Sequence, residues 1–508
     1  TVLLGQGAYV KDIGSGHGIT YYNQPVNNYQ DASFAWPTVP DDITGYSYTN
    51  NETTLSSLFA RVNYDFKEKY LFTGIIRRDG SSRFGANNKY GVFPSFSAGW
   101  VPTKEDFWEE NKIVNFLKVR GGYGVTGNDE IGNYGYLSVI NGGYNYTIGN
   151  NGAVAVGNTL ARPQNRDIAW EETAMTNIGF DSVLFEDFTF TFEWYNKKTS
   201  GMLLQVAVPG YVGNSGPIGN VADMTNKGFE FELGFNKQFG DLSFRMSANG
   251  SFIDNKVVFL GDDKTFLGGQ TITPQGLQVT RTQVGYAIGS FYGFRSNGLF
   301  QNNADVVNYK NAAGTQIQPG AKPGDIRFVD LNGDGQINED DREIIGDPTP
   351  DFTYGLSFNL GWKGFDLYML GTGVAGNQIF NGLRRFDLPS ANYTTDILDR
   401  WRGEGTSNTM PRLTTADDNK NYSRVSSLFL EDGTYFRIKV LQLGYTLPTT
   451  FTKRAGVNKV RFYVMANNLL TLTKYTGYDP EIGGGSYGVD RGFYPQARTF
   501  FAGINVGF

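Results

Sequence analysis

The most distinctive run of potential metal ligands in this sequence is a loop of twelve residues that begins at Asp330. Its spacing follows the pattern D-x-[DN]-x-[DN]-G, in which alternate residues supply oxygens to a hard cation and a glycine makes the sharp turn. The six candidate ligands are Asp330, Asn332, Asp334, Gln336 through its backbone carbonyl, Asn338 through water, and Asp341. The pattern predicts a structural Ca²⁺ site, and the alternative is an acidic turn held by side-chain to backbone hydrogen bonds.

Other arrangements that resemble catalytic or nucleotide-binding sites are weak. The segment Gly371–Gly376 fits G-x-G-x-x-G, but no helix pattern follows it, so a nucleotide site is not expected. Glu230 and Glu232 have the spacing of an acid/base pair, yet two carboxylates on one face of a strand are also expected on a polar channel wall. Cysteine is absent and His17 is the only histidine. We therefore expect no enzymatic activity.

Tyrosines in segments rich in glycine and asparagine are the candidate substrate-binding residues. Aromatic faces stack on sugar rings and also grip peptides. The alternative is that these rings pack loops together or lie in an interfacial aromatic band. The six candidates are Tyr134, Tyr136, Tyr144, Tyr475, Tyr478 and Tyr487.

The elements that position these residues are predicted to be long amphipathic strands. In the longest run, Phe352–Trp362, apolar side chains alternate with Thr, Gly, Ser and Asn. Runs of about 10 to 12 residues, tilted by roughly 45°, span about 25 Å, which is the height of the apolar band of an outer-membrane barrel. Strands of soluble proteins are typically about half as long. The fold class expected is therefore an all-β, transmembrane antiparallel β-barrel.

The connections between these strands alternate between short polar turns and long loops, as in barrels with short periplasmic turns and long extracellular loops. Thirteen strands are predicted, with starts near 54, 70, 92, 114, 170, 187, 226, 240, 352, 365, 434, 458 and 499. Residues 1–53 are interpreted as an extracellular loop or connecting segment, and 54–508 as the barrel. Residues 285–300 are interpreted as a hairpin within a loop. Because bacterial barrels usually have even strand numbers, an odd count predicts further strands before residue 54.

Composition supports this class and excludes others. The net charge of -6 and the pI near 5.2 argue against nucleic-acid binding. No run of apolar residues reaches the roughly 18 that a membrane-spanning helix needs. The chain ends on an alternating strand that stops at Phe508, the kind of terminus that the outer-membrane insertion machinery recognises. The predicted location is the cell outer membrane, in contact with its lipid.

Several longer strings resemble one family of transporters. The stretches are NYDFKEKYLFTGIIRRDGSSRFGANNKYGVFPSFSAGW (63–100), LKVRGGYGVTGN (117–128), NKGFEFELGF (226–235), GDIRFVDLNGDGQINEDDREIIGDPTPDFTYGLSFNL (324–360) and EDGTYFRIKVLQLGYTLP (431–448). They resemble the barrel of SusC/RagA-type TonB-dependent transporters of Bacteroidetes. The resemblance runs from about residue 54 to the C-terminus.

This resemblance implies a barrel of about 22 strands. It also implies an N-terminal plug, a TonB–ExbB–ExbD complex that supplies energy, and a SusD-like surface lipoprotein that closes the outer face. The plug is not expected in this chain. The function implied is import of oligomeric nutrients, either oligosaccharides or oligopeptides. The alternative is an outer-membrane scaffold or surface-assembly component that uses the same barrel, which an upstream plug and TonB-contacting segment would argue against.

Overall fold

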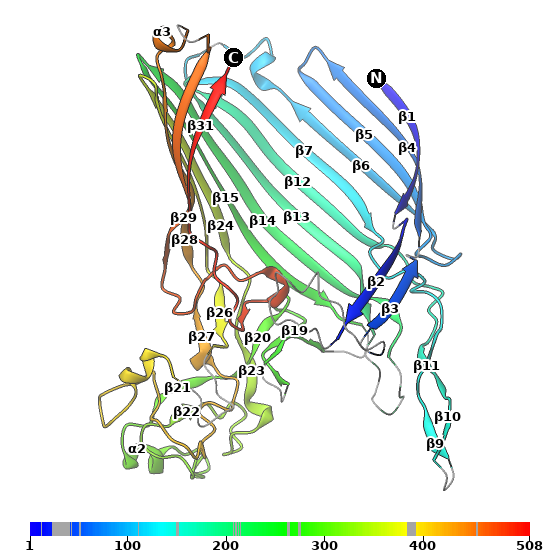
Figure 1. Ribbon diagram of the computed structural model, residues 1–508, viewed down its shortest axis with the longest axis vertical. Helices are drawn as coiled ribbons and strands as arrows, with labels where there is room; N and C mark the ends of the chain where they lie inside the picture. Colours follow the sequence, from blue (N-terminus) through cyan, green and yellow to red (C-terminus); the bar gives the residue numbers. More distant parts are fainter. Residues whose placement is uncertain are drawn as a thin grey trace.

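The dominant element is one antiparallel sheet of 14 strands. The computed structural model describes the chain apart from residues 12, 23–40, 42, 50–51, 110, 149–151, 207, 209–210, 212, 214, 262–264, 273–275, 384–392 and 454–455. Figure 1 shows the sheet curved, with oblique strands, short turns at one end and long loops at the other. The predicted all-β transmembrane barrel class is confirmed.

The strands of this sheet follow one another as simple antiparallel neighbours. In order they are β1 (Val2–Lys11), β4 (Thr53–Phe66), β5 (Tyr70–Ser81), β6 (Tyr90–Trp100), β7 (Val114–Asn128), β12 (Glu171–Leu184), β13 (Phe188–Gln205), β14 (Ile218–Phe239), β15 (Leu242–Phe259), β24 (Phe352–Trp362), β25 (Phe365–Ala375), β28 (Tyr435–Thr446), β29 (Lys459–Thr473) and β31 (Thr499–Gly507). This sequential order is that of an up-and-down barrel wall.

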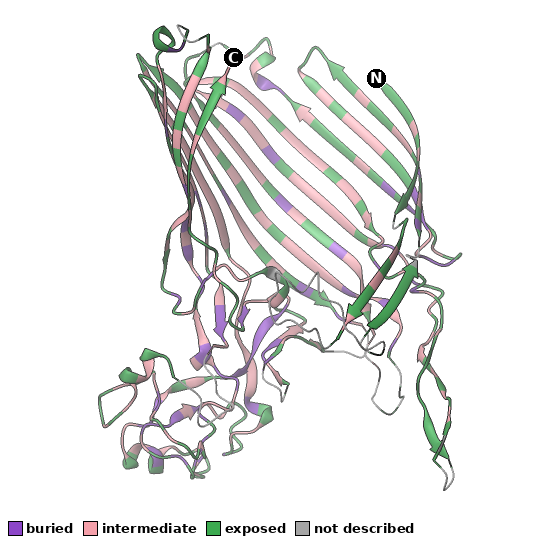
Figure 2. Ribbon diagram, viewed as in Figure 1, coloured by how far each residue is buried: buried purple, intermediate pink, exposed green. Residues whose placement is uncertain are grey.

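Alternation gives the wall two chemically different faces. On β24, Phe352, Leu356 and Trp362 share one face, while Thr353 and Ser357 lie on the other. Cross-strand partners preserve this division, as in the pair Ser247 and Ser357 between β15 and β24. The polar face lines a cavity and is the inner face of the wall. The apolar face, with many exposed aromatic side chains, is the outer one. Figure 2 shows that exposed and partly buried residues alternate along these strands.

The first strand lies where a polar loop was predicted. Residues 2–11 pair with β4 in an unbroken register from Val2 opposite Val62 to Lys11 opposite Thr53. The interpretation of 1–53 as loop or connecting segment is therefore wrong for this segment, and the strand count rises from thirteen to fourteen. Gly5 and Gly7 interrupt the alternation on one face of β1, because neither position carries a side chain, and this interruption hid the strand. Both chain ends lie at the short-turn end in Figure 1.

The short turns were predicted correctly and have the geometry that tight antiparallel hairpins need. Lys67 and Glu68 have φ values of 54° and 55°, and Phe185 and Glu186 have 52° and 67°. Two successive positive φ angles characterise the turns whose twist matches that of the flanking strands. These turns therefore hold the register of β4 with β5 and of β12 with β13.

Three central strands extend beyond the predicted limits. β13 and β15 each contain 18 residues, and β14 contains 22. β14 begins at Ile218, where a loop was predicted as far as residue 225, and bulges between Thr199 and Leu203 accommodate its pairing with β13. The wall thus continues past the apolar band on the loop side.

The long loops are folded and contain small sheets of their own. Their elements are β2 (Ser15–Tyr21), β3 (Ile43–Thr49), β8 (Val139–Gly142), β9 (Tyr146–Ile148), β10 (Ala153–Ala155), β11 (Asn158–Arg162), β16 (Phe266–Gly268), β17 (Thr271–Ile272), β18 (Leu277–Gln278), β19 (Thr280–Gln283), β20 (Ser290–Phe294), β21 (Ser296–Leu299), β22 (Ile326–Phe328), β23 (Arg342–Gly346), β26 (Gln378–Asn381), β27 (Leu430–Asp432), β30 (Val489–Asp490), and the short helix α2 (Asn303–Asn308). The short helix α3 (Thr449–Thr452) lies between β28 and β29 at the short-turn end (Figure 1). The hairpin predicted over 285–300 is wrong in its pairing, because β20 pairs with β19 and β23, and β21 pairs with β22.

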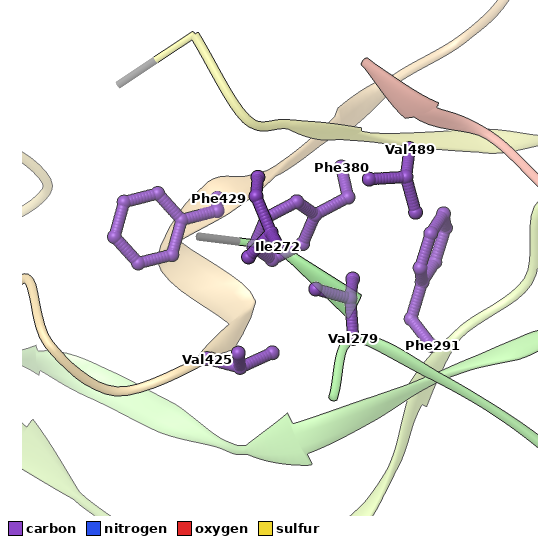
Figure 3. Close-up of a cluster of buried hydrophobic side chains, with 7 residues drawn as sticks. All are labelled: Ile272, Val279, Phe291, Phe380, Val425, Phe429 and Val489. Carbon is purple, nitrogen blue, oxygen red and sulfur yellow. The ribbon is translucent and has the colours of Figure 1, made fainter. Parts of the chain in front are cut away.

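Three long loops share one hydrophobic core. Phe291 comes from the loop after β15, Phe380 and Phe429 from the loop after β25, and Val489 from the loop after β29. These four side chains are fully buried, and Figure 3 shows them grouped together with Val425 and others. Burial of such large side chains joins loops far apart in the sequence into one extracellular unit.

No helix in the described part of the chain has the length and apolar character needed to cross a membrane.

Candidate functional site

A cavity of about 700 Å³ lies against the inner face of the wall. Strands β13, β14, β15, β24 and β25 contribute side chains to it because every second residue points inward. Its polar lining includes Thr191, Glu230, Glu232, Asn249, Ser251 and Thr353. Carboxylate, amide and hydroxyl groups of this kind accept and donate hydrogen bonds to a polar solute. The lining of this cavity is therefore suited to binding a hydrated or oligomeric polar ligand.

Charges on this wall are grouped and only partly neutralised. Arg120 on β7 contacts Glu193 and also donates to Asp181 at 3.3 Å. Glu193 is the cross-strand partner of Glu230, which accepts a hydrogen bond of 3.1 Å from Ser251. Glu232 lies two residues further along the same face. The carboxylates of Glu193 and Glu230 lie opposite each other and repel. A polar or positively charged group in the lumen would reduce this repulsion.

A second ionic group fixes the last long loop to the wall beside the cavity. Arg437, which is buried on β28, donates to Asp479 at 2.5 Å and to Glu481 at 2.6 Å. Lys439 donates to the same Glu481 at 2.5 Å. Burial raises the pKa of Asp479, but hydrogen bonds from the amides of Gln496 and Glu481, together with Arg437, outweigh burial and hold that pKa below its usual range.

The tyrosines predicted in the last loop have different environments. Tyr475 is buried and its hydroxyl donates to Asp490 at 2.6 Å. Tyr478 is 68% exposed. Tyr487 adopts a φ of 45° and lies against Gly289. Only Tyr478 of the three presents most of its ring to solvent.

The three tyrosines predicted in the loop after β7 also lie apart from the cavity. Tyr136 packs against a hydrophobic cluster that contains Phe84 and Trp170. Tyr134 and Tyr144 are exposed. The structure therefore does not bring the six tyrosines together, and substrate binding by them stays a prediction.

The loop at 330–341 adopts a hydrogen-bonded conformation. Asp330 accepts from the amides of Gly333 and Gly335 at 2.8 and 2.9 Å. Asp341, which is buried, accepts from the amides of Leu331 and Asn338, both at 2.8 Å. These are the side-chain to backbone bonds of the alternative interpretation.

Of the remaining candidate ligands, Asn332, Asp334 and Gln336 are exposed and Asn338 is partly buried. A hydrogen bond from the amide of Gln336, and further bonds from the side chains of Asn332 and Asn338, hold the pKa of Asp334 below its usual range. Among the described residues, no three His, Cys, Asp or Glu side chains are grouped as metal ligands. Calcium binding stays a prediction.

Sequence reasoning identified Glu230 and Glu232 as wall carboxylates but missed Arg120, Tyr435 and Glu481 as cavity residues. The period-two pattern of β7 and β28 carries the signal for Arg120 and Tyr435, since both occupy inward positions. Glu481 has no such signal because it reaches the wall from a loop. The G-x-G-x-x-G segment lies mostly within β25, as expected of a chance match.

Comparison with known proteins agrees with this architecture. The family model "TonB dependent receptor-like, beta-barrel" matches residues 3–469. TonB-dependent receptor P3 of Formosa agariphila is 36% identical over 477 residues, which cover 90% of this chain and 46% of that protein. TonB-dependent receptor SusC of Bacteroides thetaiotaomicron is 29% identical, with 92% of this chain and 44% of that protein covered. The chain thus spans about half the length of the curated relatives it matches.

Solved structures give the same result. The RagAB peptide importer in its "closed-closed" state matches 100% of this chain and 53% of its own chain, with 25% identity and a TM-score of 0.78. The structure of the RagAB peptide transporter matches with 24% identity and a TM-score of 0.79, which shows a shared fold. The inward polar cavity, the outward aromatic face and these matches lead to one conclusion: the chain belongs to the TonB-dependent receptor β-barrel family of the outer membrane and is of the SusC/RagA type.

Proposed function

We propose that this chain is the C-terminal barrel portion of a TonB-dependent importer of oligosaccharides or oligopeptides. The observation that carries the proposal is the inner wall itself, where a cavity lined by carboxylate, amide and hydroxyl groups lies beneath a folded loop unit. Such a surface can form many hydrogen bonds with a polar oligomer and is not shaped for one particular small ligand. One matched structure is named a peptide importer, and one relative is named SusC.

In this mechanism the wall performs no covalent chemistry. A SusD-like surface lipoprotein would close over the extracellular loops and trap the ligand above a plug supplied by the longer protein. Force from the TonB–ExbB–ExbD complex would then move the plug and open a path along the polar wall. The barrel contributes positions for hydrogen bonding and a rigid frame against which the plug and lid move.

The proposal is tested on the full-length protein purified from outer membranes. We expect it to copurify with a surface lipoprotein and with oligomeric solutes, which mass spectrometry identifies as glycans or peptides. Deleting the TonB-contacting segment of the full-length gene should abolish uptake of these solutes and leave their binding intact. Purified protein that brings down neither lipoprotein nor solute would favour the scaffold alternative instead.

A further inference from the structure

Three lysines lie close together on the outer face of the wall. Lys198 on β13 and Lys256 on β15 are both cross-strand partners of Thr225 on β14. Lys227 lies two residues from Thr225 on that same middle strand, so it shares the outer face. All three lysines are exposed. The register therefore places three ammonium groups in a triangle around one threonine.

This lysine triangle stands directly beyond a band of stacked aromatic rings. Phe192, Phe229, Phe252 and Phe352 follow one another across β13, β14, β15 and β24, with ring centroids 6.1, 4.5 and 4.3 Å apart. Aromatic rings of this kind mark the boundary between lipid tails and headgroups.

The lysines lie on the loop side of this aromatic band. Lys227 is two residues from Phe229, and Lys256 is four residues from Phe252. Lys198 is six residues from Phe192. At about 3.3 Å per residue, the three lysines lie at roughly 7–20 Å along the tilted strands from the aromatic band. That is the level of the headgroups of the outer leaflet.

Nearby carboxylates neutralise only part of the triangle. Lys198 is 3.6 Å from Asp223. Asp254 is the cross-strand partner of Lys227 and lies on the same outer face, so its negative charge offsets part of the charge of that lysine. In the described part of the chain, neither Lys227 nor Lys256 forms an ion pair within 4.0 Å.

We propose that Lys198, Lys227 and Lys256 bind the phosphate groups of an anionic lipid in the outer leaflet. Ammonium groups act as point charges for phosphate, and their attraction to anionic headgroups adds with each lysine. A lipid fits better than a free anion because the apolar face immediately below the triangle provides contact area for acyl chains. The inference is independent of which solute the barrel imports.

The test uses the full-length transporter, delipidated and mixed with one of three probes: phosphorylated lipid A, lipid A from which the phosphates were removed, or inorganic phosphate. Native mass spectrometry measures retention of each probe. A variant with Lys198→Gln, Lys227→Gln and Lys256→Gln is expected to retain about a hundredfold less phosphorylated lipid. The matched control replaces three exposed lysines at the short-turn end, Lys67, Lys363 and Lys453, with Gln and should retain as much as the wild type.

Each other outcome would overturn the proposal. Equal retention by the triple variant would show that the lysines do not hold the lipid. Equal retention of phosphorylated and dephosphorylated lipid A would show that the lysines do not recognise the phosphate groups. Displacement of the lipid by micromolar inorganic phosphate would show that the site binds the free anion and not the lipid. Heat-dependent gel mobility checks that each barrel is folded. If the triple variant does not fold, Lys227→Gln alone takes its place, and we expect it to lose an intermediate amount of lipid.

Discussion

At the residue scale, the hydroxyl of Tyr475, one of the predicted substrate-binding tyrosines, makes a buried hydrogen bond within its own loop. Its hydroxyl reaches Asp490, whose other carboxylate oxygen accepts from the amide of Gly492 at 2.8 Å. Both side chains are buried. Type and spacing alone could not separate Tyr475 from Tyr478, because burial depends on which loops meet.

Replacing Tyr475 with Phe removes the hydroxyl donor and keeps the ring. We expect the free energy of local opening of the last long loop to fall by about 1.5–3 kcal/mol, the contribution of a hydrogen bond to a charged group. Hydrogen exchange of amides near Asp490 measures this change. Tyr478→Phe is the matched control, since Tyr478 is 68% exposed and should leave the exchange unchanged. Equal effects of the two substitutions would contradict the prediction.

The 330–341 loop gives a second prediction at this scale. If calcium binds there, millimolar Ca²⁺ should raise the unfolding temperature of the extracellular unit, and a chelator should reverse the rise. Asp334→Asn should remove this response, because it deletes an exposed charged ligand while the buried hydrogen bonds of Asp341 remain. Differential scanning calorimetry of the full-length protein makes the measurement. If the unfolding temperature of the wild-type protein does not respond to calcium, the loop is held by its side-chain to backbone hydrogen bonds alone, and the calcium prediction is wrong.

At the element scale, Asp479 and Glu481 attach the last long loop to Arg437 on β28. The pKa of Asp479 is held below its usual range, so its contribution to stability is fully present above the unfolded value of about 3.9 and is lost as pH falls through the folded value. Protonation leaves Arg437 buried without one of its ionic partners.

We therefore expect this loop to detach as the pH falls below about 4. Brief digestion with pepsin, which is active in acid, should cut near residues 474–498 at pH 2 and spare them near pH 5. Asp479→Asn should be cut at both pH values, because it lacks the charge throughout. A cutting pattern in the wild type that does not change with pH would contradict this assignment.

At the scale of the whole molecule, the wall is an open sheet. Among the described residues, β1 pairs only with β4 and β31 pairs only with β29. Unpaired backbone groups are not tolerated in lipid, so both edges must be joined in the longer protein. We expect the outward amides of β1 and β31 to exchange as slowly as those of the central strand β14 in the full-length transporter. Rapid exchange at either edge in lipid would contradict closure by further strands.

The sequence by itself determined the strand pattern wherever both faces carry strong signals. Phe352–Trp362 alternates without interruption, so its strand and its facing were predictable, as were the tight turn at Lys363 and Gly364 and the polar facing of Glu230 and Glu232. Period two is a local property, and it needs no knowledge of neighbouring strands. The same reasoning failed for Val2–Lys11, because its glycines carry no facing information and only pairing with β4 reveals the strand.

Only the tertiary structure decided which loop residues meet. Phe291, Phe380 and Val489 are separated by long stretches of chain yet share one core, and Glu481 reaches the cavity because Arg437 and Lys439 hold its loop. The lysine triangle likewise depends on the register of three strands, which places Lys198 and Lys256 on either side of Thr225. Contacts between distant segments are set by packing and cross-strand register, and neither is encoded in local spacing.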